Sequence, residues 1–536
     1  MKEITILFVA TLFSTLVFSQ TNIELLSQVT YDDNLSDVWG YTDSTGREYA
    51  IVCLRGSISI EDLNDPVNPR TVAQFDAPRS TWRDAKTYGN FAYFTNENSG
   101  GLQIINLEAL PAAPDTTDSY FWAPIIPDLG QLSSCHNLYI DTETGYGFLS
   151  GCNINNGGVL IIDLFSTPGD PVFVAAAAPI YSHDVYARGN LIYSSDINNG
   201  SFSIQDMSDV DNIITVARQN TPFNFTHNAW LSDDSNTIFT TDERGNAPIG
   251  AYDISDTDDI RLLDEFRPIA SLNQNLIPHN VHVLNDFLVT SYYTEGIIIT
   301  DANRPQNLVE VGNYDTFIGL NGTFSGVWGA FPYFDSGIVL ASDIGSGLFV
   351  LRPNYTRACY LEGTVVDSLS GEALNGVSVI IFSNDPNEDV SNAMGVYRTG
   401  QVTSGTFTAR YSKEGYETKN IEVNLVNGEV SIVDVALVNL SDVTTSIPQI
   451  EELERFNVFP NPFANNFNVE FEFSSLPEET SLVVSDLLGR KIVQLSITAQ
   501  RDRLTLGQDW NNGLYMVQLV NREGVSFPIR IVKNGE

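Results

Sequence analysis

The sequence predicts an all-β protein in which a seven-bladed β-propeller is followed by two small β-sandwich domains. The first supporting observation is a short phrase that recurs along the chain, in which Asp or Asn usually follows a variable opening residue. The second residues of its copies are Asp37, Asp84, Asn137, Asp184, Asn228, Asn280 and Gly326, at intervals of 47, 53, 47, 44, 52 and 46 residues. A period in the forties, with short apolar runs and no helical periodicity, is typical of propeller blades.

A second phrase gives the same number of units. An apolar run such as 157–163, usually begun by Gly and ended by Asp or Asn, follows each opening. Each unit therefore predicts an opening strand, a second strand such as 91–95, the apolar third strand and an outer strand such as 71–75. The seventh unit ends at Leu351 without an outer strand, whereas 23–32 precedes the first unit and resembles the outer strands. We expect this N-terminal strand to complete the last blade and close the ring, which protects the sheet edges.

Four of the five histidines are opening residues of this phrase. Equivalent positions repeat around a propeller axis, so their imidazoles should lie along one arc at one mouth of the channel. Imidazole is a common ligand of transition-metal ions, which makes these side chains candidates for metal or ligand binding. The alternative is that each one bonds the backbone of the adjoining blade. The candidates are His136, His183, His227 and His279.

The other copies open without histidine, at Ser36, Arg83 and Ser325. The Asp or Asn at the second position also occurs without histidine, so we expect it to be architectural. His282 is predicted to be a partly exposed strand residue, and the alternative is that it is a further ligand. The sequence names neither a metal nor a cofactor.

Four cysteines fit an oxidising compartment. Cys135 and Cys152 flank a predicted hairpin centred on 141–146 and should face one another across two antiparallel strands, which makes them candidates for a disulfide bond. The alternative is a pair of buried, reduced thiols. Cys53 lies in the first blade and Cys359 just after the last, so ring closure would also permit a second bridge.

The ends of the chain and its charge indicate export. Residues 1–20, with Lys2 before an apolar stretch, are predicted to be a signal peptide that is removed from the mature protein. No later run approaches the roughly 18 apolar residues needed to span a bilayer, so we expect no transmembrane helix in the mature chain. The net charge of −40, from 27 basic and 67 acidic residues, disfavours nucleic-acid binding.

The blade phrases stop after Arg352, which divides the remaining chain into further domains. We assign the propeller to 21–355 and a small β-sandwich to 356–440, where strands alternate with turn residues. A polar, acidic linker is expected at 441–455, before a last β-domain at 456–536.

Turns such as 62–70, together with runs such as 159–164, resemble the LVIVD repeat. The propeller region as a whole resembles the choice-of-anchor B family of secreted bacterial propellers. That family has no generally established biochemical activity, so the resemblance implies the fold and a place outside the cell.

Two further resemblances concern the C-terminal half. Gly363-x-Val365-x-Asp367 and the later Gly415-Tyr416 resemble the carboxypeptidase regulatory-like family, which has a transthyretin-like fold and implies no peptidase activity here. The phrases at 456–463, 483–493, 512–520 and 528–534 resemble the type A C-terminal sorting domain of the type IX secretion system. This resemblance implies recognition by the type IX secretion machinery and export across the outer membrane of a Gram-negative bacterium, with the cargo released or attached to the cell surface.

The sequence contains no Gly-x-Ser-x-Gly elbow, His-Glu-x-x-His helix, phosphate-binding glycine loop or EF-hand loop. We therefore assign no catalytic residue and expect a secreted or cell-surface binding protein without enzyme activity, whose propeller engages an extracellular glycan or protein. The alternative is a metal-dependent hydrolase or lyase centred on the histidine arc.

Overall fold

The computed structural model describes residues 20–114, 118–268, 274–383, 387–441 and 449–534, so that the predicted signal peptide lies outside the described residues except for Gln20. The described chain is all-β, and its helical segments are short 3₁₀ turns such as Asn155–Gly157 and Ile197–Asn199. It divides into two compact units, Met1–Val438 and Asn439–Glu536. Each unit is described by itself.

The described residues between 20 and 353 form seven antiparallel sheets of four or five strands, which we number 1 to 7 by chain order. Six have four strands and sheet 6 has a fifth. Sheet 1 consists of β3(Leu35–Thr42), β4(Glu48–Leu54), β5(Ser57–Asp62) and β6(Arg70–Asp76), and sheet 2 of β7(Ala85–Tyr88), β8(Phe91–Phe94), β9(Leu102–Asn106) and β10(Ser119–Trp122). Sheet 3 consists of β13(Asn137–Asp141), β14(Tyr146–Ser150), β15(Leu160–Asp163) and β16(Val172–Ala176). Sheet 4 consists of β17(Val185–Arg188), β18(Leu191–Asp196), β19(Ser201–Asp206) and β20(Ile214–Asn220).

The remaining three sheets follow the same order. Sheet 5 consists of β21(Thr226–Leu231), β22(Thr237–Asp242), β23(Ile249–Asp253) and β24(Arg261–Phe266). Sheet 6 consists of β25(Val281–Leu284), β26(Phe287–Ser291), β27(Ile297–Asp301) and β28(Val309–Tyr314), with β1(Gln20–Thr21) on its edge. Sheet 7 consists of β29(Val327–Phe331), β30(Val339–Asp343) and β31(Gly347–Pro353), with β2(Ile23–Val29) as its last strand. A separate two-stranded sheet pairs β11(Ile125–Ile126) with β12(Gly130–Gln131).

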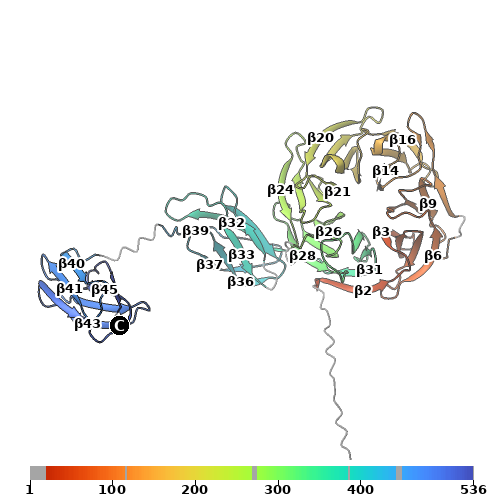
Figure 1. Cartoon of the computed structure of the whole chain (residues 1–536). Coiled ribbons are helices and arrows are strands. Elements are labelled where there is room, and N and C mark those ends of the chain that lie inside the picture. The colour runs from red at the N-terminus through yellow and green to blue at the C-terminus, as the bar shows by residue number, and fades with distance from the viewer. Residues whose placement is uncertain (1–19, 115–117, 269–273, 384–386, 442–448, 535–536) are drawn as a thin grey trace, which may run out of the picture. The chain divides into compact units, whose positions relative to one another are not determined.

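The seven sheets lie around a common centre, with first strands such as β3 and β21 nearer to it and last strands such as β6 and β24 at the periphery (Figure 1). We call the first strand of each sheet its inner strand. Neighbouring sheets touch through these strands, and β3 contacts both β7 and β29. Sheet 7 therefore packs against sheet 1 as well as against sheet 6.

Third strands such as β15 are continuous apolar runs because each one serves two hydrophobic cores. In β15, Leu160 and Ile162 face the core shared with sheet 2, whereas Ile161 between them faces the core shared with sheet 4. Successive strand residues point to opposite faces of a sheet. Both faces are covered by neighbouring sheets here, so both sets of side chains are apolar.

The N-terminal strand completes the last sheet, which confirms the predicted pairing. β2 is antiparallel to β31, and Ile23 lies opposite Pro353. The paired edge covers Leu348 and Val350, whose side chains are fully buried.

The Asp or Asn of the recurring phrase joins neighbouring sheets, as expected for an architectural residue. Asp37 Oδ2 accepts a hydrogen bond from the backbone N–H of Ala85 at 3.0 Å, and Asp84 Oδ2 accepts one from Leu138 at 3.3 Å. Asn228 Oδ1 accepts the equivalent bond from Val281 at 3.1 Å. Each of these side chains satisfies a backbone donor of the next inner strand.

A second repeated hydrogen bond corrects the sequence alignment of the seventh unit. Hydroxyl groups near the ends of second strands donate to the carbonyl of the next opening residue, as Thr95 does to His136 and Ser150 to His183, both at 2.9 Å. Ser291 donates in the same way to Trp328, also at 2.9 Å. The prediction that Ser325 opens this unit is therefore wrong, because Trp328 occupies the position.

The residue after Trp328 is Gly329, in the place that Asp or Asn takes elsewhere. A Cβ atom at this position would lie 2.5 Å from Asp37 Oδ1 and 3.0 Å from Ser342 Oγ. The close approach of sheets 7 and 1 therefore requires glycine here.

Two sheets follow within the first unit and form a sandwich. They are β35(Val396–Gln401), β32(Cys359–Asp367), β38(Val430–Ile432) and β39(Val435–Leu437), and β34(Glu388–Val390), β33(Ser378–Phe382), β36(Gly405–Ser412) and β37(Lys419–Leu425). Its core includes Val365, Val379 and Tyr411. A two-pronged ion pair attaches this sandwich to the central sheets, with Arg304 Nε and Nη2 donating to Glu362 at 2.8 and 2.9 Å.

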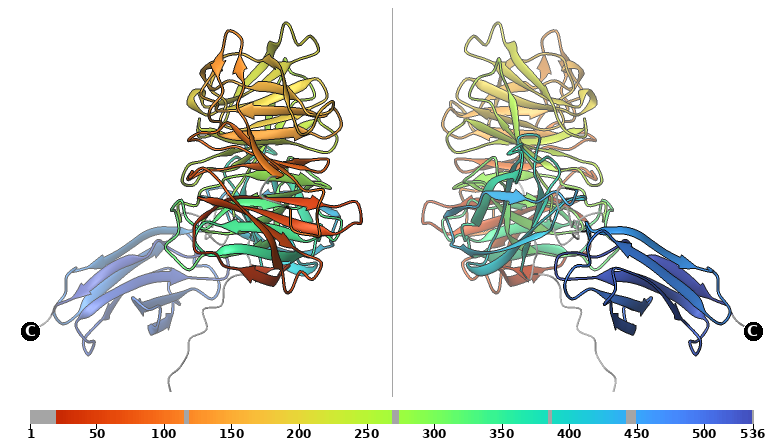
Figure 2. Two further views of the ribbon diagram at one scale, coloured as in Figure 1. Left: turned by 90° about the vertical axis from the view of Figure 1, so that its right-hand side faces the viewer. Right: turned by 90° about the vertical axis from the view of Figure 1, so that its left-hand side faces the viewer.

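The second unit, drawn in blue in Figure 2, is also built from two antiparallel sheets. They are β40(Leu453–Phe459), β41(Phe467–Phe473) and β44(Arg501–Leu506), and β43(Lys491–Ser496), β42(Ser481–Asp486), β45(Gly513–Val520) and β46(Ile529–Lys533). Alternate residues of the central strands, such as Phe467, Val469 and Phe471 in β41, form its core.

Candidate functional site

The four predicted histidines lie side by side, each at or just before the inner strand of sheets 3 to 6. The ring centroids are 4.0 Å apart between His136 and His183, 4.2 Å between His183 and His227, and 4.3 Å between His227 and His279. We call these four residues the histidine arc. The structure thus brings together all four predicted site residues, and their binding of a metal or ligand stays a prediction.

Hydrogen bonds fix the orientation of three of these rings. His279 Nδ1 lies 2.5 Å from the carbonyl oxygen of Trp328, which accepts only, so that Nδ1 carries the proton and neutral His279 keeps its lone pair on Nε2. His183 Nδ1 lies 2.9 Å from Asp184 Oδ1, and His136 Nδ1 lies 2.8 Å from Glu97 Oε1. His227 Nδ1 differs, because it is buried without a hydrogen-bond partner in the described part of the chain.

Two glutamates that sequence reasoning missed lie at the ends of the histidine arc. Glu97 contacts His136, and Glu243 Oε1 lies 4.0 Å from His279 Nε2. Both follow the same pattern, Thr-Asn-Glu at 95–97 and Thr-Asp-Glu at 241–243, just after a second strand. This repeated Thr-Asx-Glu was the available signal, because its threonine bonds the carbonyl of the next opening histidine in both copies.

Burial and neighbouring charges give the two ends of the arc different electrostatics. Burial lowers the pKa values of His183, His227 and His279 well below the ordinary value, with a further contribution from neighbouring histidines. Burial also acts against the charged form of His136, yet Glu97 raises the pKa of His136. Burial raises the pKa of Glu243 to about 7, although the hydroxyl of Tyr293 donates a hydrogen bond to it at 2.6 Å.

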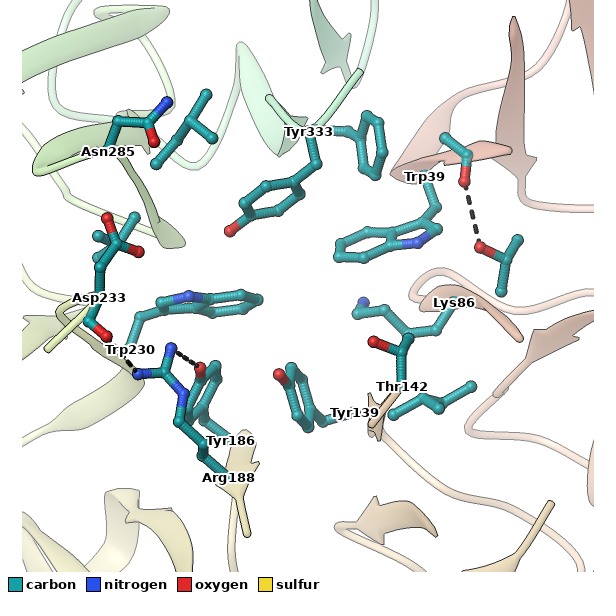
Figure 3. Close-up of a pocket in the computed structure, with 16 residues that line it drawn as sticks. Trp39, Lys86, Tyr139, Thr142, Tyr186, Arg188, Trp230, Asp233, Asn285 and Tyr333 are labelled. Carbon is teal, nitrogen blue, oxygen red and sulfur yellow. Dashed lines mark hydrogen bonds between the residues drawn. The ribbon is translucent and has the colours of Figure 1, made fainter. Parts of the chain in front are cut away.

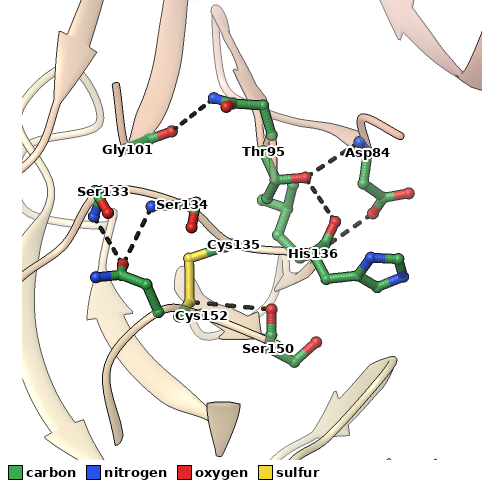
Figure 4. The surroundings of a disulfide bond; sticks show 12 residues. Asp84, Thr95, Gly101, Ser133, Ser134, Cys135, His136, Ser150 and Cys152 are labelled. Carbon is green, nitrogen blue, oxygen red and sulfur yellow. Dashed lines mark hydrogen bonds between the residues drawn. A yellow bond between two sulfur atoms is a disulfide. The ribbon is translucent and has the colours of Figure 1, made fainter. Parts of the chain in front are cut away.

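A disulfide bond between Cys135 and Cys152 lies next to the first residue of the arc (Figure 4). The pairing of Asn137 with Ser150 places the two cysteines opposite one another, just beyond the paired ends of β13 and β14. The bond ties together the two chain segments that precede and follow this hairpin, and it therefore holds the backbone next to His136. Cys53 and Cys359 are both free and buried, in two different hydrophobic cores, so the second bridge considered from the sequence does not form.

The inner strands also line a cavity of about 420 Å³ at a level three residues farther along the chain (Figure 3). Its aromatic side chains come from five different sheets and point toward a shared open centre. We call five of them the aromatic pocket, namely Trp39, Tyr139, Tyr186, Trp230 and Tyr333, and Phe331 also lines the cavity. Four of them stand three residues after an opening residue, a second periodic signal that the sequence analysis did not use.

Charged groups border the aromatic pocket. Lys86 Nζ lies 2.9 Å from Asp84 Oδ2 and 4.3 Å from the ring centroid of Trp39. Burial disfavours the charge of Lys86, but Asp84 and Asp37 raise its pKa above the ordinary value. Arg188 donates to the hydroxyl of Tyr186 at 2.7 Å, which fixes that ring at the pocket wall.

His282 belongs to the level of the aromatic pocket and not to the histidine arc. Its side chain is buried, with its ring centroid 4.7 Å from that of Trp230, and the hydroxyl of Tyr333 lies 3.3 Å from His282 Nδ1. The prediction of a partly exposed strand residue is wrong, because aromatic side chains of neighbouring sheets cover this part of β25.

Among the described residues, no helix is long and apolar enough to cross a membrane. Residues 360–438 match the family model of the carboxypeptidase regulatory-like domain, and residues 457–534 match that of the secretion system C-terminal sorting domain. No curated protein matches the chain. The second match makes the chain a substrate of the type IX secretion machinery, so the protein is secreted or attached to the outer cell surface of a Gram-negative bacterium.

Proposed function

We propose that the protein is a non-catalytic binding protein outside the cell, in which a closed seven-bladed propeller of the choice-of-anchor B type binds an extracellular glycan at its aromatic pocket. Three observations support the propeller. The seven sheets follow one another in the chain, sheet 7 contacts sheet 1, and the N-terminal strand β2 completes sheet 7.

The aromatic pocket is the observation that carries the binding function. Its volume of about 420 Å³ falls in the range of roughly 300–1,000 Å³ found for ligand sites. Sugar rings present apolar C–H faces that pack on aromatic rings, while their hydroxyls need polar partners. Aromatic walls with a few polar groups such as Lys86 and Asp233 at the edge offer both.

A binding experiment with the full chain lacking the signal peptide tests this proposal. Glycans selected on an array should quench tryptophan fluorescence in a saturable way, and Trp230→Ala should weaken that binding at least tenfold. Trp82→Phe is the matched control, because Trp82 stacks on Trp328 at the arc level and does not line the pocket. Absence of any bound glycan, or equal binding by Trp230→Ala, would contradict the proposal.

A metal-dependent hydrolase or lyase is the second candidate, and Glu243 is the observation that favours it. Its side chain is 18% exposed and its Oε1 lies 4.0 Å from His279 Nε2, so a carboxylate and the imidazoles of the arc meet where solvent has access. The same glycans therefore need to be followed by mass spectrometry after prolonged incubation. Cleavage that disappears in Glu243→Gln would establish this candidate in place of the non-catalytic protein.

A further inference from the structure

We propose that His227, His279 and Glu243 hold one divalent transition-metal ion, of which zinc is the best fit, at one end of the histidine arc. One nitrogen of each imidazole and one carboxylate oxygen of Glu243 lie within 4.8 Å of one another. Zinc binds such donors at about 2.0–2.2 Å with tetrahedral geometry, so two donors of one ion lie roughly 3.4 Å apart. The three donors therefore have to approach one another by roughly an ångström when the ion binds.

His279 is oriented as a metal ligand. Its Nδ1–H donates to the carbonyl of Trp328 at 2.5 Å, and its Nε2 lies 4.0 Å from Glu243 Oε1. Histidine ligands generally donate their other ring N–H to a carbonyl or carboxylate, which fixes the tautomer and the direction of the lone pair. The Trp328 carbonyl performs this function here.

His227 supplies an independent observation. The residue is only 2% exposed, and its Nδ1 has no hydrogen-bond partner among the described residues. A buried polar atom without a partner is costly, and a bound water or ion is one of the ways in which folded proteins satisfy such an atom. In the proposed site, His227 Nδ1 bonds either to the ion itself or to a water molecule that the ion holds.

Glu243 combines access with a fixed position. Its side chain is 18% exposed while that of His279 is 2% exposed, so an ion from solvent meets the carboxylate before it reaches the buried imidazoles. The hydroxyl of Tyr293 donates to Glu243 Oε1 at 2.6 Å and orients the carboxylate. Ligating carboxylates are commonly held in this way by a neighbouring donor.

The other end of the arc has a comparable set, His136, His183 and Asp184, but both oxygens of its carboxylate already have hydrogen-bond partners. Asp184 accepts from Asn228 at 2.9 Å and lies 2.9 Å from His183 Nδ1. His136 pairs with Glu97. We therefore place the ion at the end formed by His227, His279 and Glu243, whose hydrogen bonding is incomplete.

The donor set selects the class of ion. Two imidazoles and one carboxylate suit zinc and related transition ions, whereas Ca²⁺ and Mg²⁺ take oxygen ligands. This distinction matters in a chain with a net charge of −40, whose acidic surface attracts any divalent cation. Excess Mg²⁺ competes for the surface without competing for imidazoles.

The test uses the full chain without its signal peptide, equilibrated with Zn²⁺ in a large excess of Mg²⁺ and analysed for bound zinc after dialysis. We expect one equivalent of zinc and a rise of the thermal unfolding temperature with Zn²⁺. His279→Gln and Glu243→Gln should each weaken zinc binding by at least about tenfold, because the loss of a hydrogen-bond partner of a ligand already costs about 10- to 100-fold in metal affinity. Co²⁺ should give a visible spectrum that both variants lose.

His282→Gln is the matched control, because it removes a buried histidine of the same inner strand without touching the donor set. It should bind zinc like the unaltered protein. If His279→Gln fails to fold, Glu243→Gln carries the test, since it keeps the shape of the side chain. Zinc that excess Mg²⁺ removes, or one equivalent retained by Glu243→Gln, would overturn the proposal. No glycan takes part, so the outcome is separate from that of glycan binding.

Discussion

The histidine arc and the aromatic pocket are built on the same inner strands, three residues apart, and yet they differ in almost every property. The arc occupies four consecutive sheets, is lined by titratable groups, and is held by hydrogen bonds between sheets. The aromatic pocket draws on five sheets, and its rings surround an open cavity. A repeated strand therefore provides equivalent positions at two levels, and the side chains at each level determine what that level can bind.

The largest expected effect on stability comes from deleting β2, because the histidine arc and the aromatic pocket both depend on the packing of the seven sheets. A chain that begins at Thr30 lacks β2 and exposes the edge of β31, with its buried Leu348 and Val350. We expect loss of cooperative thermal unfolding of the first unit, measured by calorimetry or circular dichroism.

The control for this deletion is a chain that ends at Val438, which lacks only the separate second unit. Its main unfolding transition should keep its temperature. A similar unfolding curve for the chain lacking β2 would show that sheet 7 does not depend on the N-terminal strand.

A smaller effect, a loss of unfolding free energy, should follow from a substitution at Lys86. Lys86→Met removes the ammonium group that lies 2.9 Å from Asp84 and 3.6 Å from Asp37 and leaves two buried carboxyl groups facing one another. Removing one partner of a buried ion pair costs about 3–5 kcal/mol of unfolding free energy. Urea unfolding at neutral pH measures this loss.

Arg261→Met is the matched control for an exposed pair, because the side chain of Arg261 is 62% exposed where it meets Asp253. The expected loss of unfolding free energy is below about 1 kcal/mol. Equal losses in the two variants would mean that Lys86 is solvated to the same degree as a surface cation.

The smallest of these effects concerns pH at the level of the aromatic pocket. Burial, with a contribution from the charge of Lys86, lowers the pKa of His282 to about 3, whereas an unfolded histidine titrates near 6.5. The neutral ring thus stabilises the fold above pH 6.5, and this stabilisation is lost as the pH falls toward 3. Between pH 6.5 and 5, the loss is up to about 1.4 kcal/mol per pH unit for one proton.

His282→Asn should reduce this slope, and urea unfolding at pH 6.5 and pH 5 measures the difference between the two proteins. All other titrating groups, Glu243 included, are present in both proteins, so their contributions cancel in the difference. An unchanged slope in His282→Asn would show that His282 is not the group responsible.

The sequence predicted the elements whose period is enforced by packing. Apolar third strands such as β15 recur because each faces two cores, and the Asx residues recur because each one bonds the next inner strand. The four histidines could be placed on one arc for the same reason. The N-terminal strand could be assigned to sheet 7 because one outer strand was missing.

What escaped prediction depends on local geometry. The seventh unit has Gly329 where most units have Asp or Asn, and its run SGVWG at 325–329 resembles SDVWG at 36–40, so the sequence pointed to Ser325 and not to Trp328 as the opening residue. Glu243 comes from a different strand from the histidines, so that only the matching Thr-Asx-Glu at 95–97 pointed to it. The cavity of the aromatic pocket depends on how far apart the sheets stand, which no single strand encodes.

The pairing of β2 with β31 has a consequence for the order of folding during synthesis. β2 is among the first segments made, yet its partner strand is completed only after all the other central sheets have been synthesised. Contacts between segments this far apart are slow to form, because a long loop has to close first. β2 therefore stays without its partner until β31 has been made. The first unit cannot reach its final stability until the whole of it has emerged from the ribosome.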